Sequence, residues 1–257
     1  MILECLDLYV KIDKRELLNK INLKFKSGNF YAIVGPNGAG KSTMLKSIIN
    51  LIDDIKGEIK LDEKSLLELN RVEIAKKVSY MSQFFNASNL SVQGVLALGR
   101  RALSNGSLSK GDHLKIEEIS NLLNLNEWLD IPVSNLSGGE RQKVLIASCL
   151  LQEPKILLLD EPISHLDPKN QHEMLELVKK ITKEKDMITL VVLHDIHHAL
   201  HYADSLVMLK KGKILGVKLR QDIKSDDLKE LFDMDLTLYE INNHKFVYFG
   251  HEHYKKL

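Results

Sequence analysis

Cysteines and long apolar runs are both scarce in this sequence. Its 257 residues include two cysteines, Cys5 and Cys149, which lie far apart, so a disulfide framework of the secreted type is not expected and a reducing cytoplasm fits best. Glu4 and Asp7 precede any apolar stretch, and an uninterrupted apolar run of 18 residues is absent. We therefore expect neither a signal peptide nor a membrane span, and any membrane association would depend on a partner.

An excess of charge of either sign is also lacking. The 36 basic and 35 acidic residues leave a formal net charge of +1, which provides no basic surface for nucleic acid or anionic lipid. We expect no nucleic-acid partner. The 44% hydrophobic composition is enough for a substantial core, and the length fits one domain with or without an inserted subdomain.

The apolar pattern predicts an α/β fold. Short apolar runs at residues 30–34, 156–159 and 188–193 are typical of strands buried on both faces, and helical patterns separate them. This order predicts a parallel sheet in a three-layer core. From about residue 87 to 153 the strand signals stop and helical periodicity takes over, which predicts a helical insertion. After Ser225 the pattern predicts a helix, then a hairpin of residues 236–241 and 245–249.

One glycine-rich segment matches a phosphate-binding loop. Residues 35–42, GPNGAGKS, fit the pattern G-x-x-x-x-G-K-[ST] between an apolar strand and a helical stretch. Glycines let backbone N–H groups approach phosphate oxygens, and a helix N-terminus favours the negative charge. The alternative is a glycine-rich turn that matches the pattern by chance. The position of the segment between a strand and a helix favours nucleotide binding instead. The residues predicted to hold it are Asn37, Gly38, Ala39, Gly40, Lys41, Ser42 and Thr43.

Within that loop the side chains have separate predicted roles. Lys41 is placed to reach the β- and γ-phosphates, Ser42 would offer its hydroxyl to Mg²⁺, and Thr43 would hold the α-phosphate region. The predicted cofactors are therefore ATP and Mg²⁺.

Two adjacent carboxylates end the strand at residues 156–159. Asp160 is predicted to hold Mg²⁺, and Glu161 to polarise the attacking water as a general base. Acids at a strand end are ordinary at a protein surface, which is the alternative. Downstream of a phosphate loop we favour the catalytic interpretation, because ligands bind at this edge of an α/β sheet.

Residues 136–140, LSGGE, open the helical stretch 141–151 and closely resemble the signature of ATP-binding cassette proteins. The resemblance implies a single cassette ATPase domain over residues 1–257, with a three-layer phosphate-loop core and an N-terminal antiparallel β portion. Residues of about 1–86 and 154–257 would form the core, about 87–153 the helical subdomain, and about 225–257 a C-terminal extension.

The same resemblance implies a head-to-tail dimer that sandwiches two ATP molecules. Each nucleotide would lie on one chain's phosphate loop and on the signature of the other copy, namely Ser137, Gly138, Gly139 and Glu140. Asp167, in the stretch 164–167, would lie in a loop that crosses the dimer interface.

Three further positions follow from the resemblance. Gln83 matches the glutamine that touches Mg²⁺ and water and senses the membrane partner, although alone it would be only a polar loop residue. His194 matches the histidine that contacts the γ-phosphate; the alternative is an ordinary strand-end histidine. Ile12 stands where an aromatic residue usually stacks on adenine, with Tyr9 three positions earlier, so Ile12 would cover the base by apolar packing.

The resemblance also favours an importer, because importers often keep the motor on a separate chain. Residues 91–100 resemble a stretch in importers of iron-siderophores, haem and vitamin B12, unless they are simply an apolar helix face. The implied partners are multi-span permease subunits and, through them, a substrate-binding protein, with the chain peripheral on the cytoplasmic face of the membrane. Alternatives are an importer of another solute, a non-transport cassette ATPase, or a small-molecule kinase.

Histidines recur near residue 200. His194, His197, His198 and His201 follow a spacing of three and four, which suits a metal site on one helix face but is more often a surface or interface feature. We expect His251 and His253 to be solvated.

Overall fold

The computed structural model describes residues 1–83, 89–104, 107–164, 166–242 and 244–250. His165, His251 and His253 lie outside these ranges. The strands are β1 Ile2–Ile12, β2 Arg15–Lys26, β3 Asn29–Val34, β4 Asp54–Leu61, β5 Lys64–Ser65, β6 Val78–Met81, β7 Ile156–Asp160, β8 Ile188–Val192, β9 Ser205–Lys210, β10 Lys213–Leu219, β11 Leu236–Ile241 and β12 His244–Phe249. The α-helices are α1 Lys41–Ile48, α2 Arg71–Ala75, α3 Val92–Arg100, α4 Lys110–Leu123, α5 Gly138–Leu151, α6 Pro168–Glu184, α7 Ile196–Tyr202 and α8 Ser225–Phe232, with short 3-10 turns at Asn126–Trp128, Val133–Asn135 and Arg220–Asp222.

The central sheet has six strands in the order β10-β9-β3-β8-β7-β6. Strands β9, β3, β8, β7 and β6 are parallel, and β10 pairs antiparallel at the edge. All residues of β7 and β8 are buried, as their continuous apolar runs predict. Because β3, β7 and β8 are neighbours and parallel, the segments that follow them meet at one edge of the sheet. The predicted α/β class is confirmed.

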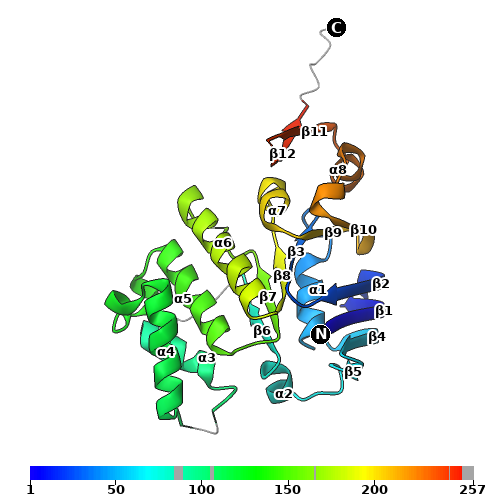
Figure 1. Cartoon of the computed structure of the whole chain (residues 1–257). Coiled ribbons are helices and arrows are strands. Elements are labelled where there is room, and N and C mark those ends of the chain that lie inside the picture. The colour runs from blue at the N-terminus through cyan, green and yellow to red at the C-terminus, as the bar shows by residue number, and fades with distance from the viewer. Residues whose placement is uncertain (84–88, 105–106, 165, 243, 251–257) are drawn as a thin grey trace.

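A second, antiparallel sheet has the order β2-β1-β4-β5. Helix α1 lies between the two sheets (Figure 1), and its Met44, Leu45 and Ile48 share one core with apolar side chains of both. This arrangement holds the start of α1 rigidly against β2. The other face of the central sheet is covered by helices that include α5, α6 and α7, whose apolar residues form the larger core.

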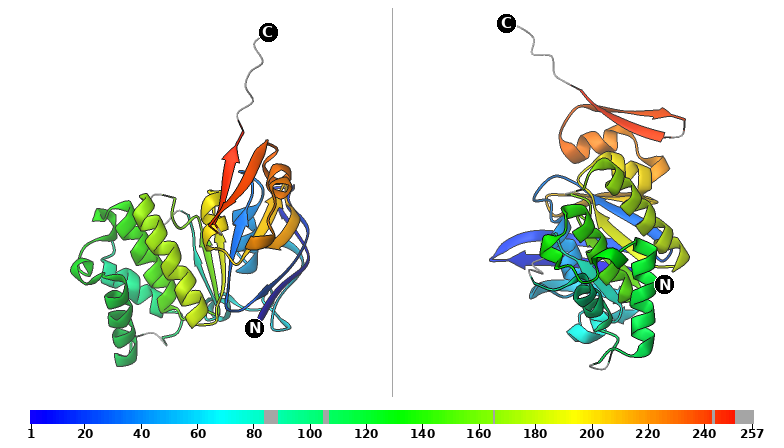
Figure 2. Two further views of the ribbon diagram at one scale, coloured as in Figure 1. Left: turned by 45° about the horizontal axis from the view of Figure 1, so that its top comes forward. Right: turned by 90° about the vertical axis from the view of Figure 1, so that its left-hand side faces the viewer.

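Helices α3, α4 and α5 lie between β6 and β7 in the chain and gather on one side of the molecule (Figure 2). A buried ion pair joins two of them, because Arg100 of α3 contacts Asp112 of α4 at 2.8 Å and also donates to the Leu151 carbonyl at the end of α5. Gly99 lies so close to α5 that a Cβ there would be 2.3 Å from the Ser148 carbonyl oxygen.

The C-terminal segment consists of α8 and the hairpin β11–β12, which confirms the predicted hairpin. In Figure 1 the hairpin lies above α7. His197 of α7 contacts it directly, with Nε2 at 3.2 Å from the Val247 carbonyl oxygen. Val247 itself is buried, so the hairpin packs on the core rather than projecting from it.

Candidate nucleotide site

The glycine-rich loop joins β3 to α1 and is tightly packed from behind. A Cβ on Gly35 would lie 1.9 Å from the Leu209 carbonyl oxygen. Gly40, the N-cap of α1, has φ 105° in the region that favours glycine, and a Cβ there would lie 2.8 Å from Leu18 Cδ2. No side chain caps this helix, so the N–H groups of its first turn remain available to an anionic ligand.

Lys41 is a buried cation, 6% exposed, at the first position of α1. Its Nζ donates to the carbonyl oxygens of Gly35 at 2.8 Å and of Pro36 at 3.0 Å. Burial lowers the pKa of Lys41, while the nearby Glu161 and Asp160 act in the opposite direction. An anion in this loop would therefore stabilise the charged ammonium.

Asp160 at the end of β7 is 2% exposed and accepts two hydrogen bonds. Ser42 Oγ donates to Oδ1 at 2.9 Å and the Tyr80 hydroxyl donates to Oδ2 at 3.2 Å. Burial raises the pKa of Asp160, and these two hydrogen bonds oppose that rise. A hydroxyl and a carboxylate oxygen thus converge from α1 and β7.

Glu161 faces a different way from Asp160 because its backbone has a left-handed φ of 55° directly after the strand. Its Oε1 lies 2.5 Å from His194 Nε2, and Gln83 Nε2 donates to its Oε2 at 2.5 Å. The three residues predicted as catalytic therefore meet at one carboxylate. A non-glycine residue in this backbone region costs about 1–3 kcal/mol and persists where surrounding contacts impose it.

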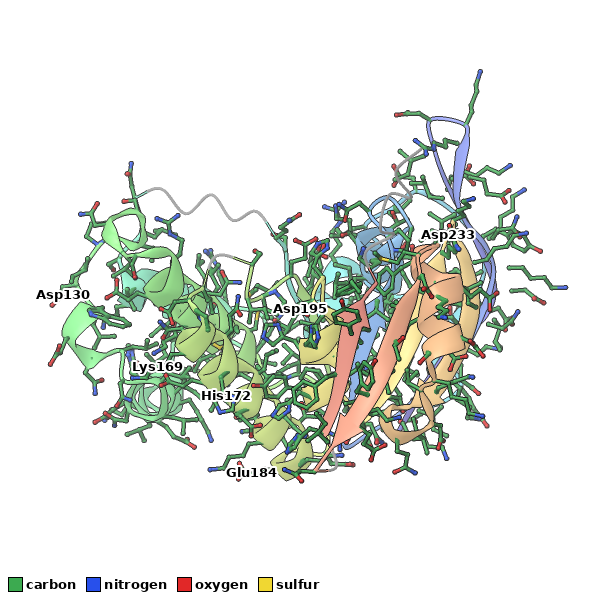
Figure 3. The ribbon with its side chains drawn as sticks, turned by 90° about the horizontal axis from the view of Figure 1, so that it is seen from above. Asp130, Lys169, His172, Glu184, Asp195 and Asp233 are labelled. Carbon is green, nitrogen blue, oxygen red and sulfur yellow. The ribbon has the colours of Figure 1, made fainter. Side chains whose placement is uncertain are left out.

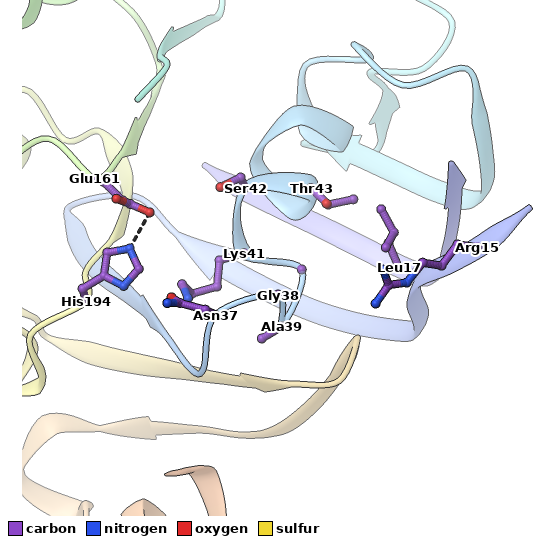
Figure 4. Close-up of a pocket in the computed structure, with 11 residues that line it drawn as sticks. Arg15, Leu17, Asn37, Gly38, Ala39, Lys41, Ser42, Thr43, Glu161 and His194 are labelled. Carbon is purple, nitrogen blue, oxygen red and sulfur yellow. Dashed lines mark ion pairs between the residues drawn. The ribbon is translucent and has the colours of Figure 1, made fainter. Parts of the chain in front are cut away.

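A cavity of about 250 Å³ opens over the loop. It is lined by Arg15, Leu17, Asn37, Gly38, Ala39, Gly40, Lys41, Ser42, Thr43, Glu161 and His194. Figure 4 shows Glu161 and His194 at one end and Arg15 and Leu17 at the other, with the loop between them. All seven predicted residues from 37 to 43 are thus brought together with two of the predicted catalytic residues.

Ile12 does not line this cavity. It ends β1, pairs with Arg15 across the turn and is 42% exposed. Leu17 and Arg15 of β2 provide the apolar and cationic contacts on this side of the cavity. The sequence did not predict either residue. The alternation of polar and apolar residues in β2 does not show which of them faces the glycine-rich loop, because that loop follows a strand of the other sheet.

The signature segment forms the start of α5 and lies outside the cavity. Ser137 is the N-cap of α5 and forms a capping box, in which its backbone N–H donates to Glu140 Oε2 at 2.8 Å and its hydroxyl accepts from the Glu140 N–H at 3.4 Å. Hydrogen bonding from the Ser137 side chain and then from the Ser137 backbone N–H lowers the pKa of the Glu140 carboxylate. Ser137 and Gly138 are exposed, and Gly139 lies against Leu166.

Asp167 likewise caps a helix, accepting from the Asn170 N–H at 3.0 Å at the start of α6. The Asn170 N–H and side chain lower the pKa of Asp167. Its local role is therefore to position the start of α6 next to the signature.

Residues 18–164 match the model of the ABC transporter family. The chain belongs to that family. A petrobactin import ATP-binding protein of Bacillus anthracis is 32% identical over 88% of this chain and 85% of its own length. An iron(3+)-hydroxamate import ATP-binding protein of Bacillus subtilis is 32% identical over 87% of this chain and 85% of its own length. A tyrosine transport ATP-binding protein of Clostridioides difficile is 36% identical over 84% of this chain and 91% of its own length.

Solved structures agree with this ABC transporter fold. The dimeric ATP-binding cassette MJ0796 bound to ADP and phosphate has a TM-score of 0.76 and 28% identity, covering 86% of this chain and all of that one. An inward-facing transporter described as of the metal-chelate type has a TM-score of 0.81, covering 96% of each chain, and its 24% identity supports the fold alone.

Membership of this family makes the chain an ATPase coupled to transport, as predicted. ABC cassettes work as dimers with membrane permease partners. Within the residues that the structure describes, none of the helices combines the length and apolar character that a membrane span requires.

Proposed function

We propose that this ABC ATPase drives a membrane importer whose cargo is a metal chelate of the iron-siderophore, haem or cobalamin type. The relatives named for petrobactin and iron(3+)-hydroxamate import support this cargo class. The observation that carries the ATPase assignment is the convergence of Gln83 and His194 on Glu161 beside the glycine-rich loop.

The oxygen atoms beside the loop fit Mg²⁺. Ser42 Oγ and Asp160 Oδ1 lie 2.9 Å apart, and hard oxygen ligands of this kind suit that ion. Gln83 would complete the protein's side of the site. When bound, Mg²⁺ neutralises charge that develops on the transferred phosphoryl group.

The chain's own residues would then divide the reaction between them. The loop N–H groups and Lys41 bind and orient the phosphates. Glu161 accepts the proton of the attacking water, and Gln83 holds the carboxylate from the other side. His194, whose Nε2 is 2.5 Å from Glu161 Oε1, positions that carboxylate and would contact the γ-phosphate end of the nucleotide, as the family resemblance implies.

The signature would act in the second copy of the chain. Ser137 and Gly138 are exposed and do not line their own cavity, so the Ser137 hydroxyl and the Gly138 N–H at the start of α5 would face a nucleotide held by a partner. Closing and reopening this dimer would move the permease through the region of Gln83. The chain would be peripheral on the cytoplasmic face of the membrane, and a substrate-binding protein would act through the permease.

The test is uptake of radiolabelled ferric siderophore by cells that lack the gene, complemented with wild type or with Glu161→Gln. Wild type should restore uptake and Glu161→Gln should not, at equal protein levels. Because the tyrosine transport relative is 36% identical, compared with 32% for the two siderophore relatives, labelled tyrosine is assayed in parallel. Restoration of tyrosine uptake without ferric siderophore uptake would contradict the proposed cargo while leaving the ATPase assignment intact.

A further inference from the structure

A cluster of potential metal ligands lies away from the nucleotide cavity, between α6 and α7. His172 and Glu176 are one turn apart on α6, and His201 comes from the end of α7. Each offers one ligand atom, and these atoms all lie within 4.8 Å of one another. Figure 3 labels His172 on α6, as seen from above. None of the three residues lines the nucleotide cavity.

A buried neighbour orients one of these ligands. His172 Nδ1 forms a hydrogen bond with the hydroxyl of Tyr202, whose side chain is only 3% exposed. In the tautomer in which Nδ1–H donates to this hydroxyl, Nε2 keeps its lone pair and can coordinate a metal. Ligating histidines in metalloproteins usually have such a support.

The second histidine is also held in place. The His201 ring lies edge-on to Tyr202 with centroids 4.6 Å apart, and it stacks on His244 of β12 at 5.4 Å. Burial lowers the pKa of His201, and the nearby His244 lowers it further. Glu176 raises it by a smaller effect, while Lys179 and His172 lower it slightly. A lowered pKa favours the neutral imidazole, which is the form that coordinates metal.

We propose that His172, Glu176 and His201 bind one divalent transition-metal ion of the Zn²⁺ class. Two imidazoles and one carboxylate are a ligand set that suits zinc and neighbouring ions, whereas Mg²⁺ and Ca²⁺ prefer oxygen ligands alone. Three protein ligands leave a position for water or for a further imidazole such as His244 beside the cluster.

Such an ion would join one helix that starts beside the nucleotide cavity to another that starts beside the signature. Helix α6 begins directly after Asp167, and α7 begins two residues after His194. The ion would join the first half of α6 to the end of α7, where His201 stacks on His244 of the C-terminal hairpin. The site is independent of the proposed cargo, because it rests on this chain's own side chains.

The experiment titrates Zn²⁺ into tag-free, nucleotide-free, full-length protein in excess Mg²⁺, by calorimetry and by the rise in melting temperature. Wild type should bind one equivalent and melt at a higher temperature with zinc. His172→Ala, His201→Ala and Glu176→Gln should each weaken binding by at least ~10-fold and lose most of the thermal shift. Without zinc Glu176→Gln should melt like wild type, because its side chain is exposed, and the zinc-dependent rise is measured against each variant's own zinc-free melting temperature.

Three controls separate this site from other histidines. His113→Ala changes an exposed residue of α4, His194→Ala changes the nucleotide site, and the double variant His251→Ala/His253→Ala changes the tail outside the described residues. All three should keep wild-type zinc affinity. The proposal is overturned if wild type binds no zinc in excess Mg²⁺, if His172→Ala and His201→Ala bind as tightly as wild type, or if His194→Ala or the tail variant abolishes binding.

Discussion

Replacement of Glu161 by glutamine tests the assignment of the general base. The amide keeps the size of the side chain, which is 12% exposed and lies between His194 and Gln83, so the fold and the cavity should be preserved. What is lost is the basic oxygen that accepts a proton from water. Loss of a positioned base typically costs ~10²- to 10⁴-fold in rate, which corresponds to about 3–5 kcal/mol in the activation free energy.

The assay is phosphate release at saturating Mg-ATP, with ATP affinity measured separately on the same protein. Glu161→Gln should bind ATP as tightly as wild type and turn over at least ~10²-fold more slowly. Glu184→Gln is the matched control, because its side chain is 58% exposed at the end of α6, and it should behave as wild type. Turnover of Glu161→Gln within about threefold of wild type would refute the role of Glu161 as base, because that loss is well below the range for a positioned base.

Three further predictions follow from the loop and from the helical portion. Lys41→Ala should weaken ATP binding by ~10- to 100-fold in a calorimetric titration, because a charged hydrogen bond is worth about 1.5–3 kcal/mol; unchanged affinity would remove Lys41 from the phosphate contacts. Gly40→Ala should lower the free energy of unfolding by about 1–3 kcal/mol in urea, because its φ is 105° and its Cβ would meet Leu18, whereas Gly111→Ala, where the nearest atom would be 3.6 Å away, should not. Hydrogen bonds from Ser109 and then Arg100 lower the pKa of Asp112 to about 2, so its stabilisation is present above its ordinary pKa of 3.8 and is lost as the pH falls toward 2. Asp112→Asn should flatten that part of the pH–stability curve, and an unchanged curve would contradict this account.

The sequence was most informative where one short segment supplies a whole structural unit. Residues 35–42 lie between a buried strand and a helix, and adjacency in the chain alone places Lys41 and Ser42 at the loop. Asp160 and Glu161 were equally predictable as a pair. Their different directions were expected as well, but the backbone cause, the left-handed φ of Glu161 after β7, was not.

Contacts between distant segments were the least predictable. Leu17 and Arg15 line the cavity and were not predicted, because the packing of β2 against the loop decides which side chains face it. That Ile12 covers adenine stays a prediction. The histidine spacing near residue 200 suggested one helix face. In the structure His194 contacts Glu161 and His197 contacts Val247, while His201 turns toward α6.

The central claim is that one copy's loop and another copy's Ser137 enclose the same ATP. The most direct measurement is the molar mass of Glu161→Gln by light scattering, with and without Mg-ATP. We predict that Glu161→Gln is a monomer without nucleotide and a dimer with it. The double variant Glu161→Gln/Ser137→Arg should fold normally and stay a monomer in both conditions. A Glu161→Gln protein that binds Mg-ATP and stays monomeric at high concentration would contradict the account.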